Sequence, residues 1–305
     1  MAYYCSDCPR KCSALRPDTV KGGGFCGCGD LISVAGVMAH KWEEPVLCGD
    51  TFTDNIFFYG CNLRCVYCQN YRISSPGLFP ESKLKVYDDK AFGALLAELD
   101  TSPGKTIGLV TGDHFARQIA RAITPDVKAA ITKPLVYNCS GYQSTEALRL
   151  LEGRIDIFMP DFKYIDSRLA AEYSHAADYP EAAKAFIAGA FEAVGPASIR
   201  PDGIMEKGLI IRHLILPGAP DNTLGVIDFI NSNFRPGEIV FSLMSQYVPV
   251  NNTPAANFPK LARKVSGAEH RKAAAYLAAC DNITEGFTQD VSSASGDFIP
   301  DFENL

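Results

Sequence analysis

The feature that most constrains the fold is a regular alternation of short apolar and amphipathic segments from Thr53 onward. The apolar segments predict six strands, at 55–59, 106–111, 134–138, 155–159, 209–216 and 238–243. The amphipathic segments predict helices, at 91–99, 115–123, 145–151, 167–194, 223–231 and 259–279. Such alternation is typical of α/β proteins with parallel strands joined by right-handed crossovers. About six units are too few for a closed eight-fold barrel.

We therefore expect a partial (β/α)6, TIM-like barrel of parallel strands, with an open doubly wound sheet as the alternative. In both architectures the active site lies at the carboxyl ends of the strands. This barrel is expected over residues 51–280. Residues 281–305 are acidic and weakly periodic, which predicts an extended tail.

Residues 1–50 differ from the rest of the chain in composition and in hydrophobic periodicity. They are rich in glycine and cysteine and have few periodic stretches, so we expect an irregular, Cys-rich metal-binding segment. Such a segment has little apolar surface to bury, and a metal would have to hold it together.

Cysteine is the unusual component of the composition. The chain has 11 cysteines, an odd number, and begins without a secretory signal. A reducing cytosol keeps thiols free, so we expect a cytoplasmic protein whose cysteines bind metal or take part in chemistry. The formal net charge of −6 gives no support for a nucleic-acid partner. The chain also lacks the run of about 18 apolar residues that a membrane span needs.

Three cysteines follow the first predicted strand in a C-x3-C-x2-C loop: Cys61, Cys65 and Cys68. Thiols this close in sequence can converge on one metal centre. A structural zinc site would need a fourth ligand, such as Cys48 or a histidine. An iron–sulfur cubane held by only three cysteines would instead leave one iron open to an exogenous ligand.

This loop resembles the signature of radical S-adenosylmethionine (SAM) enzymes, including the aromatic residue, Tyr67, before its last cysteine. Further stretches are similar to the uncharacterised branch of proteins that resemble pyruvate formate-lyase activating enzyme. These stretches are HKWEEP, NIFFYGCNLRCVYCQNY, VYNCSGYQS, DIFMPDFKY, IIRHLILPG and SLMSQYVP.

The resemblance implies a radical SAM oxidoreductase with a 4Fe-4S cluster on Cys61, Cys65 and Cys68. The open iron would bind the methionine part of S-adenosyl-L-methionine. Reductive cleavage would then release a 5′-deoxyadenosyl radical that abstracts a hydrogen atom. The partner would be a glycyl radical enzyme, which would make this protein an activating enzyme, and the reductant would be flavodoxin or ferredoxin.

The resemblance also assigns residues around SAM. It implies cofactor-binding roles for Tyr67, Asp113, Asn138, Asp161, Lys163, Arg212 and Gln246. Arg212 is also singled out by its own surroundings, because a guanidinium inside an apolar strand needs an anionic partner. Tyr67 could instead be a packing aromatic, Asp113 a helix cap, and Asp161 with Lys163 an ion pair that orders a loop.

The amino-terminal cysteines suggest a second metal site. Four of them could ligate either a second, fully ligated 4Fe-4S cluster or a zinc ion: Cys5, Cys8, Cys12 and Cys26. We favour the cluster slightly over zinc, and we favour Cys26 over Cys28 as the fourth ligand.

Two other hypotheses about the function remain beside that of an activating enzyme. One is a radical SAM enzyme that acts on a small metabolite or another protein. The other is a non-catalytic iron–sulfur or zinc protein for electron transfer or structure. We interpret Glu43 and Glu44 as part of a solvated turn before Pro45 rather than as a catalytic acid or base.

Overall fold

A computed structural model describes residues 3–250, 256–295, 300 and 302. Its strands are β1 (Tyr3–Tyr4), β2 (Leu15–Arg16), β3 (Ile32–His40), β4 (Thr53–Phe58), β5 (Lys85–Tyr87), β6 (Thr106–Val110), β7 (Leu135–Cys139), β8 (Ile157–Pro160), β9 (Ser198–Ile199), β10 (Met205–Leu214), β11 (Val240–Met244) and β12 (Gly286–Thr288).

Its helices are α1 (Pro45–Cys48), α2 (Tyr71–Ser74), α3 (Asp89–Asp100), α4 (Ala116–Ala122), α5 (Pro125–Ala130), α6 (Thr145–Leu151), α7 (Ser167–Ser174), α8 (Tyr179–Val194), α9 (Pro220–Asn233) and α10 (Gly267–Leu277). Short 3₁₀ helices are η1 (Glu81–Lys83), η2 (Asp113–Phe115), η3 (Pro259–Ala262) and η4 (Val291–Ser293).

The strands form one large, largely parallel sheet in the order β12-β11-β10-β8-β7-β6-β4-β3-β5, with β9 beside β10. All six predicted strands are present, and from β4 to β12 each neighbouring pair in this order is parallel. Along this order the described strands form an open sheet rather than a closed barrel. The expected mixed α/β class is therefore confirmed, and the strands lie in the chain order of a βα-barrel.

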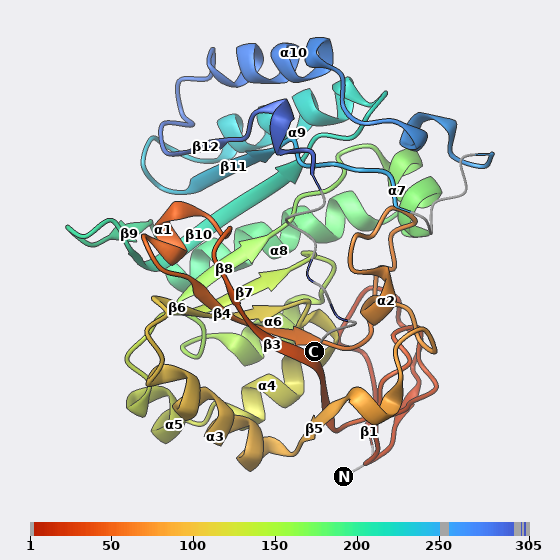
Figure 1. Ribbon diagram of the computed structural model, residues 1–305, viewed down its shortest axis with the longest axis vertical. Coiled ribbons are helices and arrows are strands. Elements are labelled where there is room, and N and C mark those ends of the chain that lie inside the picture. Colours follow the sequence, from red (N-terminus) through yellow and green to blue (C-terminus); the bar gives the residue numbers. More distant parts are fainter. Residues whose placement is uncertain (1–2, 251–255, 296–299, 301, 303–305) are drawn as a thin grey trace.

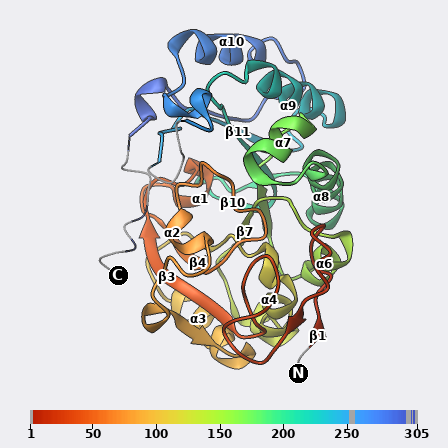
Figure 2. The same ribbon diagram turned by 90° about the vertical axis from the view of Figure 1, so that its right-hand side faces the viewer.

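Helices cover the sheet, and the loops that follow the strands gather at one edge. In Figure 1, the arrows of β7, β8 and β10 point toward the side of the molecule where α2 lies. Figure 2 looks onto this edge and shows the amino-terminal hairpin of β1 and β2 beside α4 and α6. The carboxyl ends of the parallel strands thus meet the amino-terminal segment on one side of the molecule.

The expectation for residues 1–50 is wrong in part. Residues 32–40 form the nine-residue strand β3, which pairs antiparallel with β4 and β5. The first five residues of β3 are buried, so this apolar stretch joins the main core. The irregular Cys-rich segment accordingly ends before Ile32.

Two further expectations need correction. The tail at 281–305 includes β12, which adds a parallel strand to β11, and Phe302, which is buried against Phe57. The helical pattern at 167–194 is two helices rather than one, because His175 adopts a left-handed conformation that ends α7. Pro180 then lies in the first turn of α8, where its fixed φ suits a helix start.

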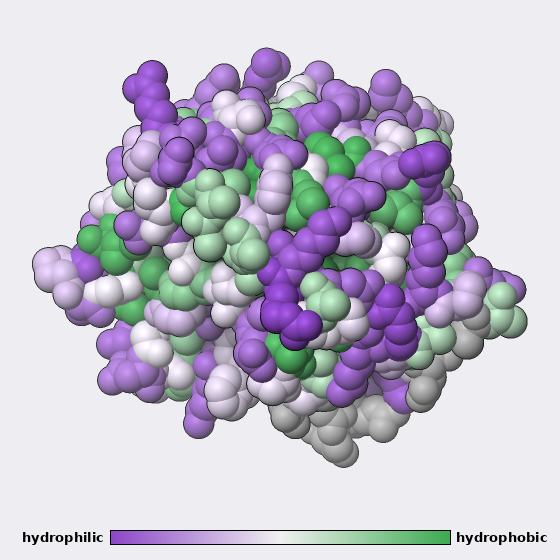
Figure 3. Space-filling model, turned by 90° about the horizontal axis from the view of Figure 1, so that it is seen from above, coloured by the Kyte–Doolittle hydropathy of each residue, from purple (hydrophilic) through white to green (hydrophobic). Residues whose placement is uncertain are grey.

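The surface shown in Figure 3, which views the molecule from the α10 side, is mostly hydrophilic with small hydrophobic groups between. None of the helices in the described part of the chain combines the length and apolar character needed to cross a membrane.

Candidate functional site

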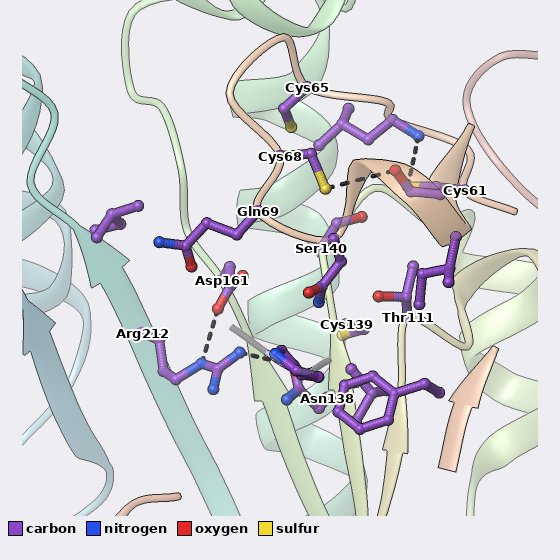
Figure 4. Close-up of a pocket in the computed structure, with 18 of the residues that line it drawn as sticks. Cys61, Cys65, Cys68, Gln69, Thr111, Asn138, Cys139, Ser140, Asp161 and Arg212 are labelled. Carbon is purple, nitrogen blue, oxygen red and sulfur yellow. Dashed lines mark hydrogen bonds and ion pairs between the residues drawn. The ribbon is translucent and has the colours of Figure 1, made fainter. Parts of the chain in front are cut away.

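A cavity of about 210 Å³ lies at the carboxyl ends of the parallel strands. The side chains that line it are far apart in sequence, from His40 in β3 to Pro300 near the end of the chain. Figure 4 shows the three cysteines of the predicted loop at one end and Asn138, Asp161 and Arg212 at the other. The cavity thus has a thiol end and an ionic end.

The thiol end is built by the loop that follows β4. Cys61, Cys65 and Cys68 all line the cavity, and each sulfur accepts a hydrogen bond. The donors are the Leu63 N–H to Cys61 at 3.3 Å, the Ser174 hydroxyl to Cys65 at 3.0 Å and the Ser74 hydroxyl to Cys68 at 3.5 Å. Such donors favour thiolate character and tune the potential of a bound metal centre.

Burial alone disfavours the thiolate forms. It raises the pKa of Cys61 to about 12 and also raises the pKa of Cys68. A metal centre would therefore displace protons from these thiols when it binds.

Gly60 lets the loop turn against the amino-terminal segment. Its φ is +82°, and a Cβ at this position would lie 2.5 Å from the Cys28 sulfur and 2.7 Å from the Cys26 carbonyl oxygen. A residue with a side chain would thus be strained in its backbone and would also collide with buried atoms.

We expect Gly60→Ala to destabilise the protein more than Gly77→Ala does. Gly77 has a similar φ of +84° but nothing within 4 Å of its Cβ position. Both variants carry a backbone cost of about 1–2 kcal/mol, and overpacking adds roughly 1–3 kcal/mol at Gly60 only. Urea unfolding measures both. Equal destabilisation would contradict this packing.

Cys48, one of the fourth ligands considered for a zinc site, does not line the cavity. The Cys48 thiol donates instead to the backbone carbonyl oxygens of Glu43 and Glu44, at 3.4 and 3.7 Å. Among the described residues, no three Cys, His, Asp or Glu side chains form a group suited to a single metal ion.

The ionic end centres on Arg212 in β10. Its Nε donates to Asp161 at 2.8 Å and its Nη2 donates to Asn138 at 2.7 Å, while Lys163 donates to the other Asp161 oxygen at 2.7 Å. Burial opposes these charges, but Arg212 and Lys163 still hold the pKa of Asp161 below its ordinary value. The four side chains thus form one chain of contacts, of which Figure 4 shows Asn138, Arg212 and Asp161.

The structure corrects the interpretation of Glu43 and Glu44 as a solvated turn. Both are nearly buried, and their Oε2 atoms lie 3.6 and 3.8 Å from Nη1 of Arg212, with no hydrogen-bond partner among the described residues. Glu43 also accepts a hydrogen bond from Asn55 at 3.0 Å and lines the cavity. A buried acidic pair therefore faces the same guanidinium as Asp161.

Glu44 is expected to make stability depend on pH. Burial raises its pKa to about 7, and the attraction of Arg212 only partly opposes this. The folded state then holds more protons than the unfolded state, so stability is full below about pH 4.5 and falls as the pH rises through about 7.

Glu44→Gln removes this titration. Between pH 5 and pH 8 the wild-type protein should lose on the order of 2 kcal/mol more than the variant. Urea unfolding at the two pH values measures the difference. Glu172→Gln, at an exposed position of α7, is the control and should behave like the wild type. Parallel pH profiles for wild type and Glu44→Gln would contradict the assignment.

Tyr67 lines the cavity within a cluster of aromatic rings. Its ring meets those of Tyr164, Tyr173 and Tyr247 edge to face, at centroid distances of 6.4, 6.2 and 6.1 Å. Tyr67 is thus both a packing residue and part of the cavity wall.

Asp113 does not lie where its predicted role requires. It is fully buried and does not line the cavity, and its carboxylate accepts three hydrogen bonds from the backbone and hydroxyl of Ser140. Thr111, two residues earlier, does line the cavity, and its backbone φ of +62° is in the left-handed region. The prediction of Asp113 as a cofactor contact is therefore corrected: Asp113 positions Ser140, which does line the cavity.

Gln246 lines the cavity, and its side chain already has a hydrogen-bond partner. Its Oε1 accepts a hydrogen bond from Gln289 at 3.0 Å, and its backbone carbonyl accepts one from Gln69 at 3.3 Å. Gln69, directly after the Cys61 loop, also lines the cavity and was not predicted. Its adjacency to Cys68 was the only sequence signal for it.

The predicted amino-terminal ligands lie outside this cavity. Cys5 and Cys26 are buried, Cys8 is half-buried and Cys12 is exposed, all in the segment that packs behind the Cys61 loop.

Comparison with known proteins gives a limited result. No family model matches the chain. The uncharacterized protein MJ0674 of Methanocaldococcus jannaschii is 27% identical over 283 residues, which are 88% of this chain and 72% of the relative.

Solved structures of similar shape include SuiB of Streptococcus suis bound to S-adenosylmethionine, with a TM-score of 0.48 and 12% identity over 76% of this chain and 48% of SuiB. Methylornithine synthase (PylB) has a TM-score of 0.46 and 12% identity over 74% and 62% of the two chains. QueE of Escherichia coli has a TM-score of 0.43 and 8% identity over 85% and 94%. The chain spans about half the length of SuiB. At these values the similarity does not transfer a function to this chain.

Proposed function

We propose that this protein is a radical SAM enzyme that holds a 4Fe-4S cluster on Cys61, Cys65 and Cys68 and cleaves SAM reductively to methionine and a 5′-deoxyadenosyl radical. The observation that carries the proposal is the set of three cavity-lining thiols on one loop, each of which accepts a hydrogen bond. When bound, a cubane with one open iron supplies the electron for this cleavage.

The donor set fits a cluster with an open corner. The other cysteine and the histidine that line the cavity, Cys139 and His40, are close to the charge of Arg212 at the ionic end. Neither supplies a fourth ligand at the thiol end. Ser174 donates to Cys65 and in turn pairs with Tyr164 at 2.7 Å, so a second layer of hydroxyls supports the ligand.

The remaining lining residues suit a zwitterionic nucleoside. Arg212 and Lys163 are the cations available to a carboxylate, with Asp161 as their present partner. Tyr67 offers an aromatic wall to an adenine ring. SAM would thus lie between the thiol end and the ionic end.

The first test is SAM cleavage. After anaerobic reconstitution with iron and sulfide, dithionite should support formation of 5′-deoxyadenosine from SAM, detected by mass spectrometry. An intact cluster that cleaves no SAM under strong reduction would favour the non-catalytic alternative instead.

For the hydrogen donor we propose a glycyl radical enzyme, with flavodoxin or ferredoxin as the reductant in a cytoplasmic setting. The ordered run of stretches similar to activating enzymes, such as NIFFYGCNLRCVYCQNY and DIFMPDFKY, supports this choice. Incubation with each glycyl radical enzyme of the host should give a glycyl radical signal by electron paramagnetic resonance. Its absence with every one of them would instead point to a small metabolite or another protein.

A further inference from the structure

The amino-terminal hairpin gathers cysteines at a place separate from the cavity. The Cys5 N–H donates to the Ala14 carbonyl at 2.9 Å and closes the loop between β1 and β2, which also carries Cys8 and Cys12. The sulfurs of Cys12 and Cys26 lie 3.3 and 3.9 Å from the position of a Cβ on Gly24. The next turn of the chain thus brings Cys26 beside the hairpin loop.

Cys8 lies in the same loop, where the Lys11 N–H donates to the Cys8 carbonyl at 3.1 Å. Cys28 follows Cys26 closely, and its thiol faces two backbone carbonyl oxygens, those of Cys26 at 3.5 Å and Tyr59 at 3.3 Å, below Gly60. We choose Cys26 over Cys28 as the fourth member of the group because the Cys26 sulfur also accepts a hydrogen bond from Arg16.

A buried cation, Arg16, lies beside these thiols. Arg16 is 1% exposed and donates from Nη1 to the Cys26 sulfur at 3.4 Å, while its Nε and Nη2 have no hydrogen-bond partner in the part of the chain that the structure describes. A guanidinium stays charged and is costly to bury without an anion.

We propose that Cys5, Cys8, Cys12 and Cys26 bind a second 4Fe-4S cluster and that Arg16 is its buried counter-ion. Four thiolates on a cubane carry the net negative charge that this guanidinium lacks.

The second site lies against the first. Arg10, between Cys8 and Cys12, donates to the carbonyl oxygens of Asn62 and Leu63 in the Cys61 loop at 2.8 and 3.2 Å. Arg10 and Arg64 also lie over the ring of Phe25, at 4.0 and 4.3 Å. These contacts hold the amino-terminal segment to the loop of the first site.

Metal analysis of a variant that lacks the first site tests the proposal separately from the proposed function. Cys61→Ala/Cys65→Ala/Cys68→Ala, purified without oxygen, should retain about four irons and four sulfides per chain. One zinc and no iron would overturn the cluster, and the absence of both metals would overturn the site.

A variant that lacks ligands of the second site keeps the test decisive if the triple variant misfolds. Cys5→Ala/Cys8→Ala should lose about four of roughly eight irons, whereas Cys28→Ala and Cys280→Ala, which removes a half-buried thiol outside both sites, should keep the wild-type iron content. Loss of no iron from Cys5→Ala/Cys8→Ala would overturn the site.

Arg16→Met tests the counter-ion. It should lose iron from the second site faster than the wild type in a chelator and lower the reduction potential of that cluster. Arg200→Met, which removes an exposed ion pair with Asp202, is the control and should match the wild type. An unchanged potential and iron content in Arg16→Met would overturn the role of Arg16.

Discussion

Cys65→Ala should reduce the formation of 5′-deoxyadenosine from SAM to the level of enzyme-free controls. Cys65 is a proposed ligand of the catalytic cluster, and its sulfur is also the one held by the Ser174 hydroxyl. Loss of one of three ligands leaves a cluster that cannot keep a defined open iron. The product is measured by mass spectrometry after anaerobic reconstitution and reduction with dithionite.

Two other cysteines provide matched controls. Cys139→Ala removes a thiol that lines the same cavity at the ionic end and should leave the iron content unchanged. Cys280→Ala removes a thiol remote from the cavity and should keep both iron content and SAM cleavage. Undiminished 5′-deoxyadenosine from Cys65→Ala would show that the reaction does not depend on this loop.

Arg212→Met should destabilise the folded protein by about 3–5 kcal/mol near pH 7. The change leaves Asp161, Glu43 and Glu44 as buried acids without their shared cation. Urea unfolding in the absence of SAM measures the effect. At pH 5 the loss should be smaller, because protonation then relieves part of the repulsion.

An exposed ion pair provides the comparison. Arg263→Met breaks the contact of Arg263 with Glu269, in which the arginine side chain is 48% exposed. Such pairs contribute about 0–1 kcal/mol. If Arg212→Met cost no more than Arg263→Met, the ionic end would not be the stabilising network described above.

The six main strands and the longer helices from β4 to α10 could be predicted because each has a clear local pattern, whereas the short elements α2, β5, α5 and β9 were not predicted. The apolar strands, such as β6 and β7, are buried along their full length and alternate with helices that have one apolar face. β3 was missed because the cysteine and glycine content of residues 1–50 concealed an ordinary apolar strand. β12 was missed because it is short and only its middle residue is half-buried.

The candidate site could be predicted where a motif or an unusual residue marks it. The spacing of Cys61, Cys65 and Cys68 and the guanidinium of Arg212 in an apolar strand are both local signals, and the structure brings all four to one cavity. The roles of Glu43 and Glu44 depend instead on a contact with a strand more than 160 residues away. No local pattern distinguishes a buried acidic pair from a solvated one.

Asp113 and Ser174 also have hydrogen-bond partners that the local sequence does not indicate. An acid after β6 suggested a contact with the cofactor, but the nearby backbone and hydroxyl of Ser140 satisfy it. Ser174 ends α7 and has no motif, yet its hydroxyl reaches Cys65 because α7 packs beside the loop. Side-chain partners of this kind are set by tertiary packing.

The most direct measurement concerns the vacant corner of the catalytic cluster. Electron nuclear double resonance on the reduced wild-type protein, with SAM labelled by ¹⁵N and ¹⁷O in its methionine part, reports whether those atoms bind iron. We predict clear hyperfine coupling to both labels, lost in Cys65→Ala. A reduced cluster whose spectrum SAM leaves unchanged, with no coupling to either label, would contradict the proposed function.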